Sequence, residues 1–254
     1  MTHRRDWIGV GRSETGFVRP TNQDAFAAIN GNRIWVVADG MGGHPAGDVA
    51  ARIAVDTVMR HAARLYHSDQ PPPSDLSSTL SDWLIAANQA IETRGEQEPL
   101  LRGMGTTIVA LGITLYPEPM AHLAHVGDSR AYLYRQDSLT QLTRDHTLVE
   151  EYLAQGLIDR HTAKTHPKRH VLTKALGIDM TVQPDRRSIS LQPNDSLLLC
   201  SDGLTKMLED EEISAILARS NGDPAQGCDH LIDQALGRGG EDNVTVIVCA
   251  ASKQ

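Results

Sequence analysis

The 254-residue sequence predicts an α+β fold in which antiparallel sheets are covered by helices on their outer faces. Two observations favour this class. The apolar strand-like runs mostly follow one another through short turns, as hairpins do. The helical patterns do not alternate one for one with these runs, as they would in a doubly wound parallel sheet.

The helical patterns cover residues 48–65 and 76–94, where apolar side chains recur at helical spacing, and the two are separated by a Ser/Asp/Pro-rich surface loop. Later patterns cover residues 208–218 and, after the Asp223-Pro224 start signal, residues 225–236. The predicted strands cover residues 7–11, 25–29, 33–38, 106–115, 121–126, 131–134, 183–191, 195–200 and 244–250.

An irregular stretch from Thr143 to Gly177 separates the hairpins from the late strands. It contains a short helical pattern at residues 147–155 and a basic turn at residues 166–170. A long excursion inside a compact domain is typical of a functional lid, and a tolerated insertion is the alternative.

The bulk properties exclude several classes of protein. The net charge of -8 argues against nucleic acid as a partner. No run approaches the ~20 apolar residues that a membrane span needs. The sequence shows no signal-peptide pattern, so we expect a cytoplasmic protein with no membrane partner.

The three cysteines predict reduced core thiols and not a catalytic nucleophile. A nucleophilic cysteine of the tyrosine-phosphatase kind needs an arginine six positions later. Lys206 stands there for Cys200, Gln234 stands there for Cys228, and Cys249 has no such residue. Covalent catalysis through such a cysteine is therefore excluded.

Four aspartates stand where a glycine-bearing turn meets an apolar strand: Asp39, Asp128, Asp202 and Asp242. Carboxylate oxygens are preferred ligands of hard divalent cations. Several such anions in one cleft repel one another unless a cation neutralises them. The set therefore predicts a metal site.

A fifth aspartate, Asp24, reaches the same end of the first hairpin. Asn30-Gly31 predicts a two-residue turn, because both residues tolerate positive φ. Counting outward from that turn places Asp24 opposite Val37, so that Asp24 and Asp39 emerge together, two residues out of register.

Seven segments, in this order and spacing, resemble the motifs of bacterial metal-dependent protein serine/threonine phosphatases, the PPM or type 2C family. These segments are residues 19–24, 39–44, 103–107, 125–130, 142–146, 201–204 and 241–245.

The resemblance implies a four-layer α-β-β-α sandwich, formed by one domain over residues 1–254 with a flap subdomain at about 143–182. It also implies two Mn²⁺ or Mg²⁺ ions and a third, weaker one. Asp39 would bridge two ions, with the Gly40 carbonyl on one of them. Asp202 and Asp242 would complete the other ion, and Asp128 would serve the third with Asp202.

The resemblance also implies the residues that act on water and substrate. Asp24 would hold metal-bound water and Arg19 would clamp the phosphate. Many eukaryotic members have a histidine directly after the Asp-Gly pair, where this chain has Met41 and, three residues later, His44. A protonated His44 would donate to the leaving alkoxide; the alternatives are that it only contacts metal-bound water or caps the next helix.

The expected activity is hydrolysis of phosphoserine and phosphothreonine in proteins by a metal-activated water, without a covalent intermediate. Its partners would be phosphorylated proteins and a cognate bacterial Ser/Thr kinase, and the chain would be a monomer. One alternative is a silent, regulatory domain of this fold, which would be expected to lose metal ligands. Calcineurin-like enzymes would show Gly-Asp-x-His-Gly, which is absent.

Overall fold

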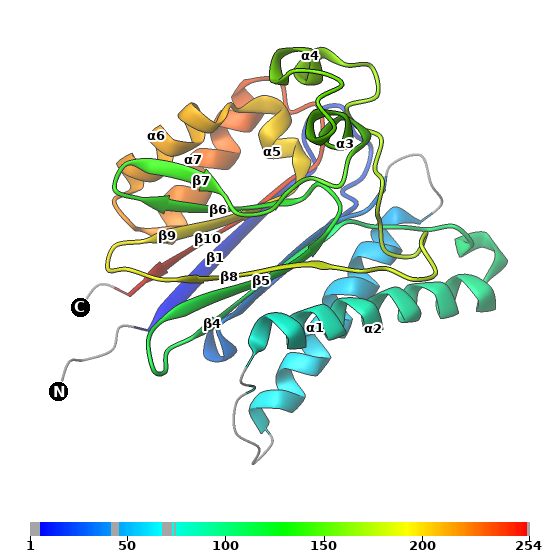
Figure 1. Cartoon of the computed structure of the whole chain (residues 1–254), viewed down its shortest axis with the longest axis horizontal. Helices are drawn as coiled ribbons and strands as arrows, with labels where there is room; N and C mark the ends of the chain where they lie inside the picture. Colours follow the sequence, from blue (N-terminus) through cyan, green and yellow to red (C-terminus); the bar gives the residue numbers. More distant parts are fainter. Residues whose placement is uncertain (1–5, 42–45, 68–72, 74, 253–254) are drawn as a thin grey trace.

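Two five-stranded antiparallel sheets form the centre of the molecule, in the orders β1-β10-β9-β6-β7 and β2-β3-β4-β5-β8. The structure is a computed structural model that describes residues 6–41, 46–67, 73 and 75–252. Helices flank the two sheets on both outer sides (Figure 1). The predicted α+β class is confirmed.

The strands are β1 (Trp7–Glu14), β2 (Asp24–Ile29), β3 (Ile34–Asp39), β4 (Ile108–Thr114), β5 (Met120–Val126), β6 (Arg130–Arg135), β7 (Ser138–Gln141), β8 (Asp185–Ser190), β9 (Ser196–Cys200) and β10 (Val244–Ala251). The helices are α1 (Gly47–His67), α2 (Leu76–Gln97), α3 (Leu148–Ala154), α4 (Arg160–Thr165), α5 (Asp202–Met207), α6 (Asp210–Ser220) and α7 (Pro224–Gly237). Short 3₁₀ turns lie at η1 (Asn30–Asn32) and η2 (Pro99–Leu101).

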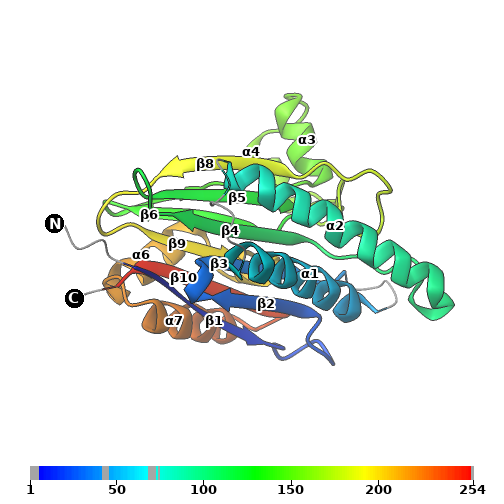
Figure 2. The same cartoon turned by 90° about the horizontal axis from the view of Figure 1, so that it is seen from below.

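The alternation of side chains along β3 shows how the layers are built. Ile34, Val36 and Ala38 pack against α1 and α2, whereas Trp35 and Val37 pack into the layer between the two sheets. Successive strand residues point to opposite faces, so a strand with apolar residues on both faces must be covered on both. A third apolar cluster joins β6, β9 and β10 to α5, α6 and α7. Figure 2 shows α6 and α7 beside β1, β9 and β10.

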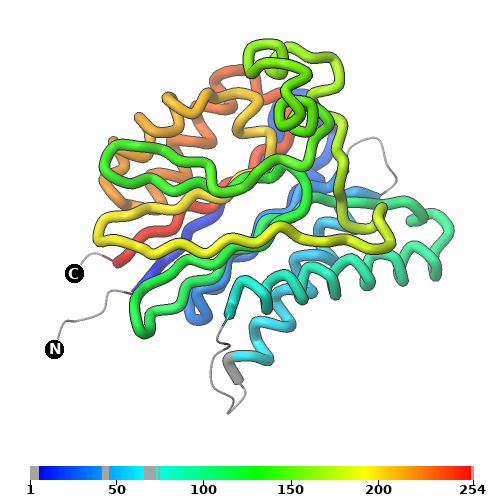
Figure 3. Tube along the Cα trace, viewed as in Figure 1, coloured from blue at the N-terminus to red at the C-terminus, as the bar shows by residue number. Residues whose placement is uncertain are grey.

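Residues far apart in the sequence lie side by side in the first sheet. β1, at the start of the chain, pairs antiparallel with β10, at its end (Figure 3). β10 pairs in turn with β9. The loops before β10 and after β9 therefore open at the same end of the sheet as the chain segment that follows β1.

The first hairpin differs from the predicted two-residue turn. Residues 30–33 form the connection, Arg33 and not Gly31 takes a positive φ, and Ile29 pairs with Ile34. Asn30 is held inward because its Oδ1 accepts hydrogen bonds from the Gly9 amide (2.8 Å) and from Trp35 Nε1 (3.0 Å). The predicted register was therefore wrong, and Asp24 pairs directly with Asp39.

One strand and two helices were not predicted: β7, α4 and α5. Residues 143–182 leave the first sheet after β7 and return at β8 in the other sheet, and they include α3 and α4 (Figure 1). That this stretch acts as a flap stays a prediction. In the described part of the chain, no helix is long and apolar enough to cross a membrane.

Candidate metal centre

Asp24 and Asp39 lie side by side at the end of the β2–β3 hairpin. Asp24 Oδ2 accepts hydrogen bonds from Ser201 Oγ (2.8 Å) and Thr245 Oγ1 (2.6 Å), which belong to the other sheet and its loop. Asp24 Oδ1 is buried without a hydrogen-bond partner among the described residues. Asp24 thus links the two sheets and keeps one free acceptor oxygen.

The backbone around Asp39 and Gly40 is fixed by several bonds. The Asp39 carbonyl accepts from the Thr107 amide (2.9 Å) and from Thr106 Oγ1 (2.8 Å). The Gly40 amide donates to the Gln23 carbonyl (3.1 Å). A Cβ on Gly40 would overlap the Gly47 carbonyl, so only glycine permits this close approach.

Two cations hold Asp202 and Asp242. Lys206 Nζ lies 2.6 Å from Asp202 Oδ2 and 2.8 Å from Asp242 Oδ2. Arg19 donates to both oxygens of Asp242, through Nε (2.8 Å) and Nη2 (2.9 Å). This fork is the bidentate geometry that also suits phosphate oxygens.

Asn243 docks the segment that carries Arg19 onto the turn before β10. Its Nδ2 donates to the carbonyls of Thr15 (2.8 Å) and Thr21 (3.0 Å), and its Oδ1 accepts from the Gln23 amide (2.9 Å). The Asn243 side chain is buried, so these bonds satisfy groups that water does not reach. They bring Arg19 and Asp24 to the same end of the molecule as Asp242.

Asp128 follows β5 in a connection that Thr107, the residue before β4, contacts. Thr107 Oγ1 and Ser129 Oγ share a 2.7 Å hydrogen bond. Burial, then the negative charges of Asp202 and Asp145, raise the pKa of Asp128 to about 8. The charge of Asp202 reaches Asp128, which places the two carboxyls in one electrostatic cluster.

The carboxyls of the cluster fall into two groups, according to whether their pKa values are raised by burial or lowered by a bonded cation. Burial raises the pKa of Asp24 to about 6, and burial with the charges of Asp24 and Asp202 raises the pKa of Asp39 well above its usual value. Burial also acts to raise the pKa of Asp242, but the bonds from Lys206 and Arg19 hold it below its usual value.

These observations fit a divalent cation. Asp24, Asp39 and Asp128 are acidic groups that burial and mutual repulsion drive toward protonation, and the donors are oxygen atoms, the ligands of hard cations. Adding positive charge to the cluster would let all of its carboxyls ionise.

The structure therefore brings together six of the predicted site residues and places Gly40 beside them. His44 lies outside the described residues. Two residues at the centre were not predicted: Lys206 and Asn243. The spacing of Lys206, four residues after Asp202, becomes a signal only when residues 202–207 are helical.

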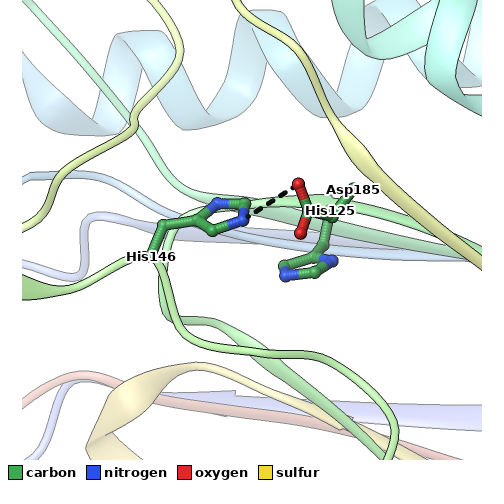
Figure 4. A group of neighbouring side chains, drawn as sticks. All are labelled: His125, His146 and Asp185. Carbon is green, nitrogen blue, oxygen red and sulfur yellow. Dashed lines mark ion pairs between the residues drawn. The ribbon is translucent and has the colours of Figure 1, made fainter. Parts of the chain in front are cut away.

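A second group with metal-ligand chemistry lies at the base of the 143–182 stretch: His125, His146 and Asp185, whose ligand atoms lie within 4.8 Å of one another (Figure 4). The two imidazole rings stack with centroids 4.7 Å apart. His146 Nε2 lies 3.3 Å from Asp185 Oδ1.

The hydrogen bonds of this second group favour a structural role over metal binding. His146 Nδ1 accepts from the Gly127 amide (3.1 Å), so the ring proton of neutral His146 is on Nε2, facing Asp185. Burial, then the neighbouring charges of His125 and Lys174, lower the pKa of His146 to about 4. Lys174 Nζ already supplies a cation to Asp185, at 3.0 Å.

A family model for "Protein phosphatase 2C" matches residues 18–226. The serine/threonine phosphatase stp of Listeria innocua is 37% identical over 243 residues, which cover 93% of each chain. The serine/threonine protein phosphatase PstP of Mycobacterium tuberculosis is 40% identical over 237 residues, covering 93% of this chain and 43% of that protein.

Among solved structures, the catalytic domain of PstP in complex with 2 manganese ions is similar, with a TM-score of 0.80 and 36% identity. The similarity covers 97% of this chain and 99% of that one. Sequence and fold are therefore shared over almost the whole length of this chain. The chain therefore belongs to the protein phosphatase 2C family of bacterial protein serine/threonine phosphatases.

Proposed function

We propose that this chain hydrolyses phosphoserine and phosphothreonine in proteins with divalent metal ions held by Asp39, Asp202 and Asp242. The observation that carries the proposal is the cluster of carboxyls from both sheets, in which burial and like charges raise the pKa values of Asp24, Asp39 and Asp128. The manganese ions of the similar PstP catalytic domain support it.

In this proposal Asp39 and the Gly40 carbonyl would hold Mn²⁺ or Mg²⁺ ions, with Asp39 shared between two of them. Asp202 and Asp242 would complete the second position, and Asp128 with Asp202 would hold a third, weaker ion. Oxygen donors serve Mn²⁺ and Mg²⁺ alike. When bound, such ions lower the pKa of water and neutralise charge on the phosphoryl oxygens.

The side chains around the ions orient water and substrate. Asp24 is anchored through Oδ2, so its free Oδ1 is a fixed acceptor for the hydrogen of a water molecule. Arg19 uses Nε and Nη2 on Asp242 and keeps the Nη1 donors for a phosphate oxygen. We assign the proton of the leaving alkoxide to His44; the alternative is that His44 only positions water or caps α1.

The reaction requires no protein nucleophile, and the cysteines support this part of the proposal. Cys200, Cys228 and Cys249 are free and buried. Burial raises the pKa of Cys200 and of Cys228 to about 12, which keeps both thiols protonated. Water is therefore the proposed nucleophile, without a covalent intermediate.

The proposed partners are phosphorylated proteins and the Ser/Thr kinase that phosphorylates them. Residues 143–182 would form a flap beside the site, within a single domain that acts as a monomer. Three free, buried thiols support the proposed reducing, cytoplasmic location.

The proposal is tested by hydrolysis of p-nitrophenyl phosphate and of a phosphothreonine peptide, with Mn²⁺ or with EDTA. We expect EDTA to abolish turnover, and Asp39→Asn and Asp242→Asn each to lower kcat by at least about 100-fold. Loss of a residue that only orients a metal ligand typically costs about 10–100-fold in activity, and loss of a ligand itself should cost more.

The matched control is Asp229→Asn, which removes an exposed carboxylate that pairs with Arg12 at 2.9 Å. It should leave turnover unchanged. Activity that persists in EDTA, or in both site variants, would overturn the proposed function.

A further inference from the structure

Lys206 occupies an unusual position for a helix-surface lysine. It stands four residues after Asp202 on α5, and its ammonium bridges two carboxylates, at 2.6 Å from Asp202 Oδ2 and 2.8 Å from Asp242 Oδ2. Its side chain is 25% exposed, and those of Asp202 and Asp242 are 19% and 16% exposed. The bridge therefore lies within the site and not on the outer surface.

The other i,i+4 ion pairs of the helices provide a comparison. Arg94 and Glu98 are 48% and 47% exposed, and Arg52 and Asp48 are 72% and 43% exposed. Each joins only neighbouring turns of one helix, and such exposed pairs contribute little to stability. Lys206 differs because it also reaches Asp242, which belongs to the turn before β10.

The two carboxylates depend on Lys206 to different degrees. Among the described residues, Asp202 forms an ion pair with Lys206 alone, whereas Asp242 pairs with both Lys206 and Arg19. Both aspartates are the proposed ligands of one metal position. An oxygen that accepts from an ammonium at 2.6–2.8 Å has that lone-pair direction occupied, so it cannot simultaneously bind an ion along the same direction.

We propose that Lys206 is an internal counter-cation that competes with divalent metal ions for Asp202 and Asp242. It neutralises the pair in the metal-free protein, and its ammonium gives up the oxygen lone pairs that an ion takes when the metal position fills. Metal affinity is therefore lower than the carboxylates alone would give, and Lys206 sets the metal concentration at which the site loads. This inference rests on the proposed assignment of the two aspartates as metal ligands.

The test is calorimetric binding of Mn²⁺ to EDTA-treated, dialysed protein, with thermal unfolding of the metal-free forms. Lys206→Met removes the ammonium and keeps the apolar stem. We expect Mn²⁺ to bind about tenfold more tightly to this variant than to the wild type. We also expect a lower Tm of the metal-free variant and a larger rise of Tm on adding Mn²⁺.

Lys164→Met is the matched control. Lys164 also pairs with one carboxylate, Glu209, at 2.6 Å, but the two side chains are 66% and 65% exposed and lie outside the carboxyl cluster. Loss of this lysine changes the net charge by the same amount. Both the Mn²⁺ affinity and the size of the Tm rise should match the wild type.

Equal or weaker Mn²⁺ binding by Lys206→Met, against a wild type that binds Mn²⁺, would overturn the inference and leave the proposed function standing. Absence of Mn²⁺ binding in both proteins would contradict the proposed function as well. If Lys206→Met does not fold, Lys206→Gln keeps a polar amide without the charge, and the same tighter binding is expected of it.

Discussion

At the scale of single residues, the acidic groups of the site differ in what surrounds them. Asp242 receives Lys206, Arg19 and the Asn243 amide, and its pKa is lowered. Asp24, Asp39 and Asp128 are buried among like charges, and their pKa values are raised. These shifts predict how protons and metal ions compete for the same oxygens.

The metal-free protein should lose stability as the pH rises from 5 to 8. The pKa of Asp128 is raised from 3.8 to about 8, so between these values the folded state binds more protons than the unfolded state. The free energy of unfolding then falls with rising pH, by on the order of a few kcal/mol. Urea unfolding of EDTA-treated protein at pH 5 and pH 8 measures this difference.

Asp128→Asn should flatten that pH dependence, because an amide does not titrate. Asp24, whose pKa is raised to about 6, would still contribute at the lower end of the range. A wild type whose stability is unchanged or increases from pH 5 to pH 8 without metal would contradict the raised pKa values.

At the scale of elements, α5 positions both Asp202 and Lys206, and it fits against the turn before β10 through Gly203. A Cβ on Gly203 would overlap the Asn243 carbonyl oxygen, which is backbone and cannot move aside. This contact fixes the distance between the two segments that carry Asp202 and Asp242.

Gly203→Ala should therefore destabilise the protein by about 1–3 kcal/mol or more, as overpacking in an interior does. Gly237→Ala is the matched control, since Gly237 ends α7 with nothing within 4 Å of its hypothetical Cβ. The control should unfold at the same urea concentration as the wild type or a higher one. Equal midpoints for both variants would contradict the close fit at Gly203.

The elements also show what the sequence could and could not predict. The uninterrupted apolar run at residues 34–38 predicted the strand β3, and the structure shows that both of its faces are buried. The glycine-marked aspartates predicted that carboxyls gather at these strand ends; that they bind metal stays a prediction. The register of the first hairpin could not be predicted, because a side-chain anchor at Asn30 and a positive φ at Arg33 override the Asn-Gly turn signal.

The same limit applies to the site. Residues 202–207 form a helix of six residues that directly follows β9, too short for helical periodicity to identify. Without that helix nothing in the sequence places Lys206 over Asp202. Asn243 was likewise missed because its three hydrogen bonds reach the 15–23 segment, more than 200 positions away in the chain.

At the scale of the whole molecule, the site lies where the two sheets meet. Asp24 and Asp39 come from one sheet, whereas Ser201, Asp202 and Asp242 stand at the strand ends of the other. Bonds from Ser201 and Thr245 to Asp24 connect the sheets at this end, and apolar packing connects them along their length. Metal ions bound here would tie the two sheets together.

Bound metal should therefore stabilise the entire fold. A ligand that binds only the folded state, at 100 times its Kd, adds about 2.7 kcal/mol to the free energy of unfolding. We expect Mn²⁺ to raise the Tm of the wild type, and EDTA to reverse the rise. A Tm that does not depend on Mn²⁺ would contradict a metal site between the sheets.

The most direct measurement is calorimetric titration of Mn²⁺ into the EDTA-treated wild type and into Asp39→Asn. Asp39 is the proposed bridging ligand, so the wild type should bind two or more ions and the variant should bind them at least about 100-fold more weakly. Circular dichroism of both proteins would confirm that the variant is folded. Folded Asp39→Asn that binds Mn²⁺ with wild-type affinity would contradict a metal centre built on this carboxylate cluster.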